Sequence, residues 1–322
     1  QPAESNKWLG APRWVRPGPR ALRRARQARM AELGMVFGDD DVELIEGEQW
    51  DELSVEMRER AAREMEVYAA MVEEMDRNVG RIIEELTSQG TLEETVILFM
   101  SDNGASGSDW SEVRRIFAGM GVGPDLLADF DKANSNPSAI GAQDSFIVYG
   151  PQWAQAAMAP FRLYKGYTNE GGIKSAAFVR GPGIVHAQSS DALLSVRDIF
   201  PTLLDLAGLR PKASNNAGGA RSWSALLSGR EGAVRAGDDF IAMEFNGRRM
   251  IIRADGWKAV YSSATVRGLG GGTPSWQLFN LRNDRSEVSD LALSRPQILT
   301  ELVAEWEKYA RENNIRADLL KK

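Results

Sequence analysis

The predicted fold is organised around the stretch Thr95-Val96-Ile97-Leu98-Phe99-Met100-Ser101-Asp102-Asn103-Gly104. An apolar run with a β-branched start leads directly into a carboxylate, an amide and a glycine. A short apolar run that ends in turn residues predicts a central parallel strand covered on both faces. In open α/β sheets, ligands bind just beyond the carboxyl ends of the strands. The stretch therefore predicts a binding site at the end of a sheet.

Asp102 and Asn103 are the candidate ligands at this strand end. Their side-chain oxygens are hard donors suited to Ca²⁺ or Mg²⁺, and Gly104 lets the backbone turn tightly behind them. The alternative is an ordinary turn, because Asp, Asn and Gly dominate turns for conformational reasons alone. A lone Asp-Asn-Gly tripeptide favours that alternative, so the surrounding sequence decides between the two.

A long amphipathic helix is predicted before the strand, from about Ser54 to Gln89. Apolar residues recur there every three or four positions, which places them in one stripe. Gly90 is expected to end the helix as a C′ glycine. Met57, Met65, Met71 and Met75 are interpreted as core residues. The stripe consists of Met65, Tyr68, Val72, Met75, Val79, Ile82 and Leu86.

Composition excludes several classes of function. The chain has 322 residues, room for about two domains. It carries 39 basic and 45 acidic residues, a net charge of −6, which predicts no nucleic-acid partner. The arginine-rich segment Arg20–Met30 is accordingly interpreted as a solvated helix face, with a nucleic-acid arm as the alternative. No apolar stretch approaches the ~20 residues of a membrane helix, so no membrane partner is expected.

Cysteine is absent, which excludes disulfides, thiolate metal sites and a cysteine nucleophile within the chain and fits a reducing compartment. His186 is the single histidine. Because there is only one histidine, a zinc site built from several histidines is excluded, and a Ser-His-Asp triad would have one candidate base.

Three regions are predicted. Residues 1–45 form a loop and a basic helix, 46–211 an α/β domain and 223–322 a small α+β subdomain, with a Gly/Asn/Ser-rich linker at 212–222.

Turn signals organise the predicted elements of the second half. A helix is expected up to Gly208, with Asp198 as its N-cap. Further on, short β runs are separated by Asn246-Gly247 and Asp255-Gly256, which predicts antiparallel hairpins. A closing helix is predicted from Pro296 to about Glu312.

Several stretches resemble type I (formylglycine-dependent) arylsulfatases of the alkaline-phosphatase-like superfamily, most similarly the bacterial aryl/alkyl sulfatase branch. The strand end S-D-N-G with a later K-G-x-T-x-E-G-G-I is specific to that family. The matching stretches are MEVYAAMVEEMDRNVGRIIEEL, VILFMSDNGASG, IVYGPQWAQAAMAPFRLYKGYTNEGGIKSAAFVRGPG, RDIFPTLLDLAG and DGWKAVY…SWQLFNL, between residues 60 and 310.

The resemblance implies an α/β fold, an alkaline-phosphatase-like mixed sheet flanked by helices with a small C-terminal antiparallel sheet plus helix. Asp102 and Asn103 match the later pair of Ca²⁺ ligands. Lys165 matches the lysine that contacts a sulfate oxygen and helps the leaving group, and Glu170-Gly171-Gly172 matches the support of that lysine. The implied substrate is a small sulfate ester, and a cation with an ammonium suits the charge that builds as the S–O bond breaks.

The family's nucleophile is a formylglycine made from the Cys or Ser of C/S-x-P-S-R, and this sequence has neither a cysteine nor an S-x-P-S-R. This sequence also has no counterpart of the family's first two Asp metal ligands, its first catalytic lysine or its catalytic histidines. His186 is interpreted as a surface loop residue. The chain is therefore expected to be the C-terminal part of a sulfatase, without the N-terminal part of the fold. One edge and one face of its sheet should then lie open.

Two alternatives stay open. Instead of a piece of a sulfatase enzyme, the chain could be a non-catalytic remnant that binds an oxyanion or a cation weakly. It could also be a piece of a related phosphate or phosphonate ester hydrolase. The W-A-Q-A and R-L-Y-K-G segments favour a sulfatase over the latter.

Overall fold

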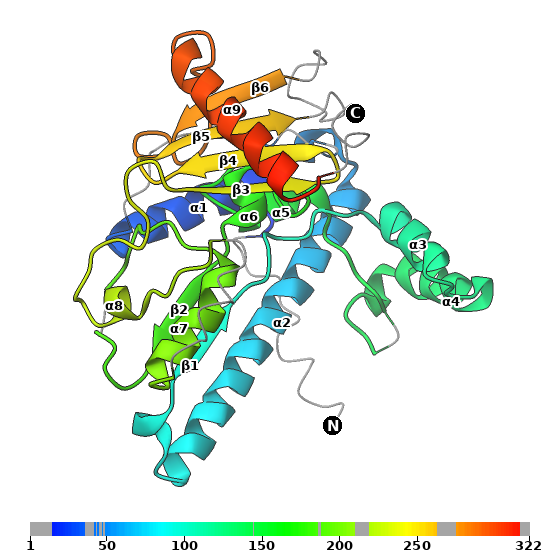
Figure 1. Cartoon of the computed structure of the whole chain (residues 1–322). Helices are drawn as coiled ribbons and strands as arrows, with labels where there is room; N and C mark the ends of the chain where they lie inside the picture. The colour runs from blue at the N-terminus through cyan, green and yellow to red at the C-terminus, as the bar shows by residue number, and fades with distance from the viewer. Residues whose placement is uncertain are drawn as a thin grey trace.

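The computed structural model describes residues 15–35, 42, 44, 47, 49–143, 145–185, 188–209, 219–262 and 275–315. His186 and most of the predicted linker 212–222 lie outside these residues. Helices flank a two-stranded sheet in the first part, and one helix covers a four-stranded sheet in the last part (Figure 1). Among the described residues, no helix combines the length and apolar character needed to cross a bilayer. The elements are α1 (Pro19–Glu32), η2 (Trp50–Glu52), α2 (Val55–Ser88), η3 (Leu92–Glu94), β1 (Ile97–Met100), α3 (Trp110–Gly119), α4 (Pro124–Ser135), η4 (Pro137–Ala139), α5 (Gly150–Ala157), α6 (Glu170–Ile173), β2 (Ala177–Arg180), η5 (Val196–Asp198), α7 (Ile199–Leu206), α8 (Ser224–Leu227), β3 (Phe240–Phe245), β4 (Arg248–Arg253), β5 (Trp257–Ser262), β6 (Ser275–Asn280) and α9 (Pro296–Glu312).

β1 lies antiparallel to β2, with Met100 opposite Ala177. All four residues of β1 are half-buried, and the rings of Phe99 and Phe178 stack with their centroids 4.9 Å apart. The prediction of a parallel strand covered on both faces is therefore wrong. The chain returns beside β1 through β2, and the described residues supply no further strand to this sheet. β1 is apolar because it packs on β2, and the rest of its surface stays partly exposed.

α2 begins and ends as predicted, and its first half packs in the core. The Ser54 hydroxyl accepts a hydrogen bond from the Met57 N–H, which caps the first turn. Gly90 has a left-handed φ of 70°, as a C′ glycine requires. Met65 is fully buried in a cluster with Leu22 and Trp153, so this part of the apolar stripe packs against α1 and α5.

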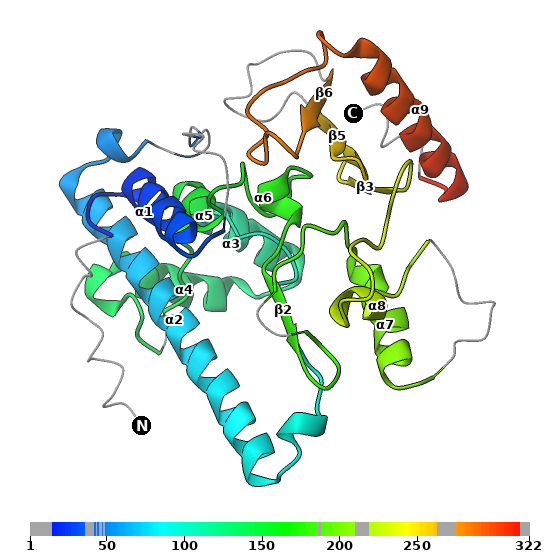
Figure 2. The ribbon, with the colours of Figure 1, turned by 90° about the vertical axis from the view of Figure 1, so that its left-hand side faces the viewer.

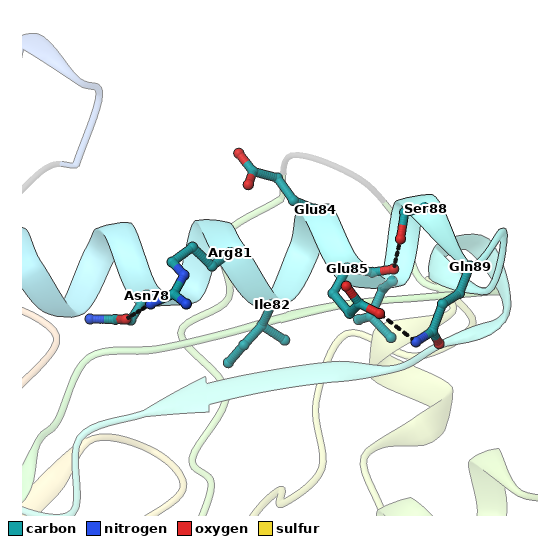
Figure 3. Close-up of a pocket in the computed structure, with 8 residues that line it drawn as sticks. Asn78, Arg81, Ile82, Glu84, Glu85, Ser88 and Gln89 are labelled. Carbon is teal, nitrogen blue, oxygen red and sulfur yellow. Dashed lines mark hydrogen bonds between the residues drawn. The ribbon is translucent and has the colours of Figure 1, made fainter.

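The second half of α2 carries an open apolar face. Met75 is 46% exposed and Ile82 is 60% exposed, and Ile82 points towards β1 beside a hollow of about 810 Å³ (Figure 3). Met57 and Met71 are also exposed, so Met65 alone of the four methionines lies in the core. Phe178 of β2 is 55% exposed. Within the described part of the chain, the expected open face is present.

α1 is anchored by two of its arginines. Arg23 is 1% exposed and donates hydrogen bonds to the carbonyl oxygens of Gln155 (2.7 Å) and Phe161 (3.0 Å). Arg26 donates to the Ala156 carbonyl at 3.1 Å. These carbonyls lie at and beyond the C-terminus of α5, where the last carbonyls of a helix lack the i+4 N–H partners of its interior. Interpreting the whole basic segment as a solvated face is therefore wrong, although Arg24 is exposed.

The C-terminal sheet has the strand order β3-β4-β5-β6, and all its pairs are antiparallel. Asn246 and Gly247 both have positive φ, as a two-residue type I′ hairpin requires, which confirms that turn prediction. α9 covers one face of the sheet, and α6 lies on the opposite side (Figures 1 and 2). Ile173 of α6 and Leu193 pack against that opposite face. The sheet is therefore held between α9 and the segment that includes α6.

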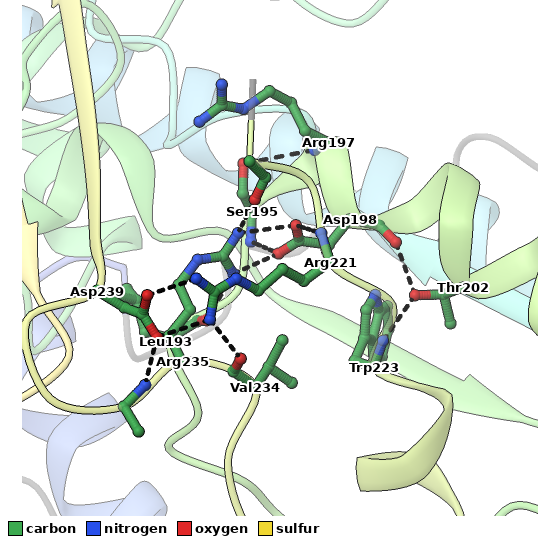
Figure 4. Close-up of polar contacts among 12 residues, drawn as sticks. Leu193, Ser195, Arg197, Asp198, Thr202, Arg221, Trp223, Val234, Arg235 and Asp239 are labelled. Atoms are coloured by element: carbon green, nitrogen blue, oxygen red, sulfur yellow. Dashed lines mark hydrogen bonds and ion pairs between the residues drawn. The ribbon is translucent and has the colours of Figure 1, made fainter. Parts of the chain in front are cut away.

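Asp198 is the centre of a buried polar cluster beside α7 (Figure 4). Its carboxylate accepts two hydrogen bonds from Arg235, at 2.6 and 2.9 Å, and one each from the backbone N–H groups of Arg221 and Ser195. Burial acts to raise the pKa of Asp198, but these hydrogen bonds outweigh it and hold the pKa below its usual range. Asp198 stands at the N-cap position of α7, as predicted, but its side chain accepts no hydrogen bond from the N–H groups of α7 and instead accepts one from the Ser195 N–H.

Candidate active site at the end of β1

The SDNG turn (Ser101–Gly104) follows β1 directly. The Ser101 hydroxyl donates a hydrogen bond to the Asn103 carbonyl at 2.9 Å and so closes the turn. The side chain of Asp102 is exposed and that of Asn103 is half-buried. Among the described residues, neither side chain has a hydrogen-bond or ion-pair partner. Two side-chain oxygens are thus available to a ligand at the end of the sheet.

Three backbone hydrogen bonds join the SDNG turn and the next residue, Ala105, to the lysine loop, defined here as residues 162–174, and to Ala176 just after it. The Lys165 N–H donates to the Ala105 carbonyl, and the Gly104 N–H donates to the Gly172 carbonyl, both at 3.0 Å. The Ser101 N–H donates to the Ala176 carbonyl just beyond the loop, also at 3.0 Å. The structure therefore brings the backbone of Lys165 beside a residue only two positions after Asn103.

The Lys165 side chain is exposed. Within the described part of the chain its ammonium forms no ion pair. A cation on a rigidly held backbone, without an internal counter-ion, is suited to meet an external anion.

The SDNG turn and the lysine loop interlock at Gly104, and the loop is itself closely packed at Gly172. A Cβ on Gly104 would lie 1.8 Å from the carbonyl oxygen of Gly171, and a Cβ on Gly172 would lie 2.1 Å from the carbonyl oxygen of Tyr167. Gly104 does not have a left-handed φ. A glycine is therefore required at position 104, but not for the predicted reason. The close approach of Gly171 requires it, and not a tight turn of the backbone.

The C-terminal sheet holds the other side of the lysine loop. Arg248 of β4 donates a hydrogen bond to the Gly166 carbonyl at 3.0 Å, and its guanidinium lies 4.5 Å from the ring centroid of Tyr167. The Thr168 hydroxyl donates to the Arg249 carbonyl at 3.3 Å. The loop is therefore fixed between the SDNG turn and β4.

A buried charge cluster, Lys258–Glu170–Glu287, lies behind the loop. The Lys258 Nζ is 2.8 Å from Glu170 Oε1 and 2.8 Å from Glu287 Oε1, and all three residues are buried. Sequence analysis missed Lys258 and Glu287. The available signal was the alternation of β5, which places Lys258 on the same face as the core residue Val260.

The donors present suit part of a calcium site. Ca²⁺ takes about six to eight oxygen ligands, and the SDNG turn offers the side chains of Asp102 and Asn103. Across the described residues, no group of three or more His, Cys, Asp or Glu side chains is placed to hold a metal ion. Asp102 and Asn103 therefore fit calcium as two of several ligands.

The sulfatase family model matches residues 22–209, which is more than half of the chain. This chain belongs to the sulfatase family. An uncharacterized sulfatase of Schizosaccharomyces pombe is 37% identical to it over 310 residues, 92% of this chain and 53% of that protein. An arylsulfatase of Klebsiella aerogenes is 32% identical over 194 residues, 59% of this chain and 40% of that protein.

The sulfatase chain spans about half the length of these curated relatives. Among solved structures, that of Ps i-CgsB superposes with a TM-score of 0.52 at 23% identity, over 91% of this chain and 54% of that one. This likeness shows the fold alone. The predicted α/β, alkaline-phosphatase-like fold and the resemblance to sulfatases are both confirmed.

Proposed function

We propose that this sulfatase-family chain carries the C-terminal half of a Ca²⁺ and sulfate site, in an enzyme that hydrolyses an aryl sulfate ester to an alcohol and sulfate. The observation that carries the proposal is the 3.0 Å hydrogen bond from the Lys165 N–H to the Ala105 carbonyl. It joins the turn that presents two oxygen ligands to the loop that presents the Lys165 ammonium, which has no ion-pair partner among the described residues. The similarity to the Klebsiella arylsulfatase supports the aryl ester as substrate class.

Each residue has a defined role in this proposal. Asp102 and Asn103 would hold Ca²⁺, which when bound supplies a fixed positive charge beside the sulfate oxygens. Lys165 holds its ammonium against a sulfate oxygen and the leaving-group oxygen, which gain negative charge as the S–O bond breaks. Removing one such donor typically costs about 2.7–4 kcal/mol of barrier. The formylglycine nucleophile and the other calcium ligands are assigned to sequence that this chain does not contain.

The domain division 46–211 and 223–322 belongs to the same proposal. Asp102, Asn103 and Lys165 all lie in the first of these domains, and Arg248 and Lys258 reach the lysine loop from the second.

A non-catalytic oxyanion and cation binding protein is the second candidate, favoured by the absence of a C/S-x-P-S-R motif from the sequence. Turnover of 4-nitrophenyl sulfate by this chain alone would contradict it, because turnover requires a nucleophile. Turnover of 4-nitrophenyl phosphate in preference to the sulfate would instead favour a phosphoester hydrolase.

Calcium binding by the purified chain is expected to be weak and to depend on the SDNG turn. Two ligands of about six to eight cannot hold the ion tightly, and Asp102→Ala or Asn103→Ala should abolish the binding that remains. Isothermal titration with CaCl₂ measures this. Asp125→Ala, which removes an exposed carboxylate on α4, is the matched control and should bind as the wild type does. Tight binding by the Asp102→Ala/Asn103→Ala double variant would refute the assignment.

A further inference from the structure

The Lys258–Glu170–Glu287 cluster joins three separate elements. Glu170 begins α6 at the end of the lysine loop, Lys258 lies on β5, and Glu287 follows β6. Lys258 and Glu287 are 0% exposed and Glu170 is 5% exposed. Further charges face the cluster: Lys174 Nζ is 3.8 Å from Glu170 Oε2, and Arg285 attracts the Glu170 carboxylate.

Two carboxylates share the single buried ammonium. Burial raises the pKa of Glu287. Burial also acts to raise the pKa of Glu170, but the cations around it, Lys258 foremost, together outweigh burial and lower that pKa. Taking such charges out of water is costly, and apolar side chains of similar volume often stabilise a core as well or better. Stability alone is therefore a weak reason for this cluster, and the atoms that it holds in place indicate a different role.

Glu287 bridges the two ends of the lysine loop. Its carbonyl accepts a hydrogen bond from Arg162 Nη1 at 3.0 Å, and its Oε2 accepts one from the Glu170 N–H at 2.9 Å. Lys165 lies between these two anchored positions. Glu287 also has a φ of 55°, a left-handed conformation that is strained for a residue with a side chain. Contacts on both sides hold the buried Glu287 in this conformation, and Glu287 in turn restricts the movement of the lysine loop.

We propose that Lys258 is a positioning residue, which acts through Glu170 and Glu287 to hold the lysine loop where the Lys165 ammonium can meet a sulfate beside the SDNG turn. The inference rests on the proposed function of Lys165. Lys258, Glu170 and Glu287 touch no substrate in this account. The C-terminal sheet thereby contributes to the sulfate site from behind the loop.

Hydrogen–deuterium exchange of the intact chain tests the positioning itself. Lys258→Met removes the shared ammonium, and Glu287→Gln keeps the Lys258–Glu170 pair in case the first variant does not fold. We expect the amides of residues 162–174 to exchange at least about tenfold faster in either variant, equivalent to about 1.4 kcal/mol of lost protection. Asp198→Asn breaks a different buried ion pair and is the matched control, with loop exchange unchanged. Unchanged loop exchange in Glu287→Gln would overturn the proposal.

Protection of Lys165 by inorganic sulfate tests the link to function. The acetylation rate of Lys165 by acetic anhydride is measured by mass spectrometry with and without sodium sulfate. Sulfate should slow the reaction in the wild type and in Asp198→Asn, and not in Glu287→Gln, an outcome that a purely structural role of the cluster would not produce. Equal protection in Glu287→Gln contradicts the positioning role alone. No protection in the wild type contradicts the proposed function of Lys165, while the exchange measurement still decides whether the cluster holds the loop.

Discussion

Replacing Gly104 with alanine is expected to destabilise the folded chain by about 3 kcal/mol or more and to separate the SDNG turn from the lysine loop. The new Cβ would lie 1.8 Å from the carbonyl oxygen of Gly171. That oxygen belongs to the backbone, and the loop is closely packed there, because a Cβ on Gly171 would itself lie 2.2 Å from the Leu163 carbonyl oxygen. Urea unfolding followed by circular dichroism measures the loss.

Gly80→Ala is the matched control for this substitution. Gly80 lies inside α2 with no atom within 4 Å of its Cβ position and without a left-handed φ. Alanine there should stabilise the chain by about 0.5–1 kcal/mol, because glycine is a poor helix former. If Gly104→Ala is as stable as the wild type, the interlock of the two segments is refuted.

Asp198→Asn is expected to cost about 3–5 kcal/mol at neutral pH, because it leaves the Arg235 guanidinium buried without its carboxylate partner. The effect should depend on pH. The folded-state pKa of Asp198 is depressed, so its contribution is complete above the unfolded pKa of about 3.9 and is lost as the pH falls through the folded value. The variant should therefore approach the wild type in stability below about pH 4.

Thermal unfolding of both proteins between neutral and acidic pH measures this convergence. Glu305→Gln removes an exposed partner of Lys308 and serves as the control, with little change at any pH. A constant difference between Asp198→Asn and the wild type across the whole range would contradict the assigned role of the Asp198 carboxylate.

Local sequence patterns predicted much of the fold correctly. The 3.6-residue periodicity and the Ser54 and Gly90 signals are properties of α2 itself, so α2 could be read without knowledge of its partners. The Asn246-Gly247 hairpin is equally local, since both residues adopt the positive φ that the turn requires. These elements have the structure that was predicted.

The errors concern contacts between distant segments. β1 is antiparallel because β2, some eighty positions later, returns beside it. Arg23 is buried because the carbonyls at the end of α5 lie next to α1. A pattern of apolar and charged residues states which side chains favour burial, but not which remote backbone atoms are available to satisfy a charge.

The residues of the candidate site also fall into those that local sequence could predict and those that it could not. Asp102, Asn103 and Lys165 could be proposed from motifs, since each stands in a short stretch that resembles the sulfatase pattern. Glu287 could not be proposed, because its role depends on a left-handed backbone and on contacts with Arg162 and Glu170 more than a hundred positions earlier. Residues that support a site from behind carry no local signature of their own.

We propose that Ca²⁺ at the SDNG turn and the Lys165 ammonium act on the same sulfate. Titration of the chain with sodium sulfate, with and without CaCl₂, tests it most directly, because two ligands that share a site must change each other's affinity by the same factor. We predict that Ca²⁺ strengthens sulfate binding in the wild type and in the exposed-lysine control Lys132→Ala, and that Asp102→Ala and Lys165→Ala each remove this coupling. Sulfate binding that is the same with and without Ca²⁺ in the wild type, or coupling that survives both substitutions, would contradict the account.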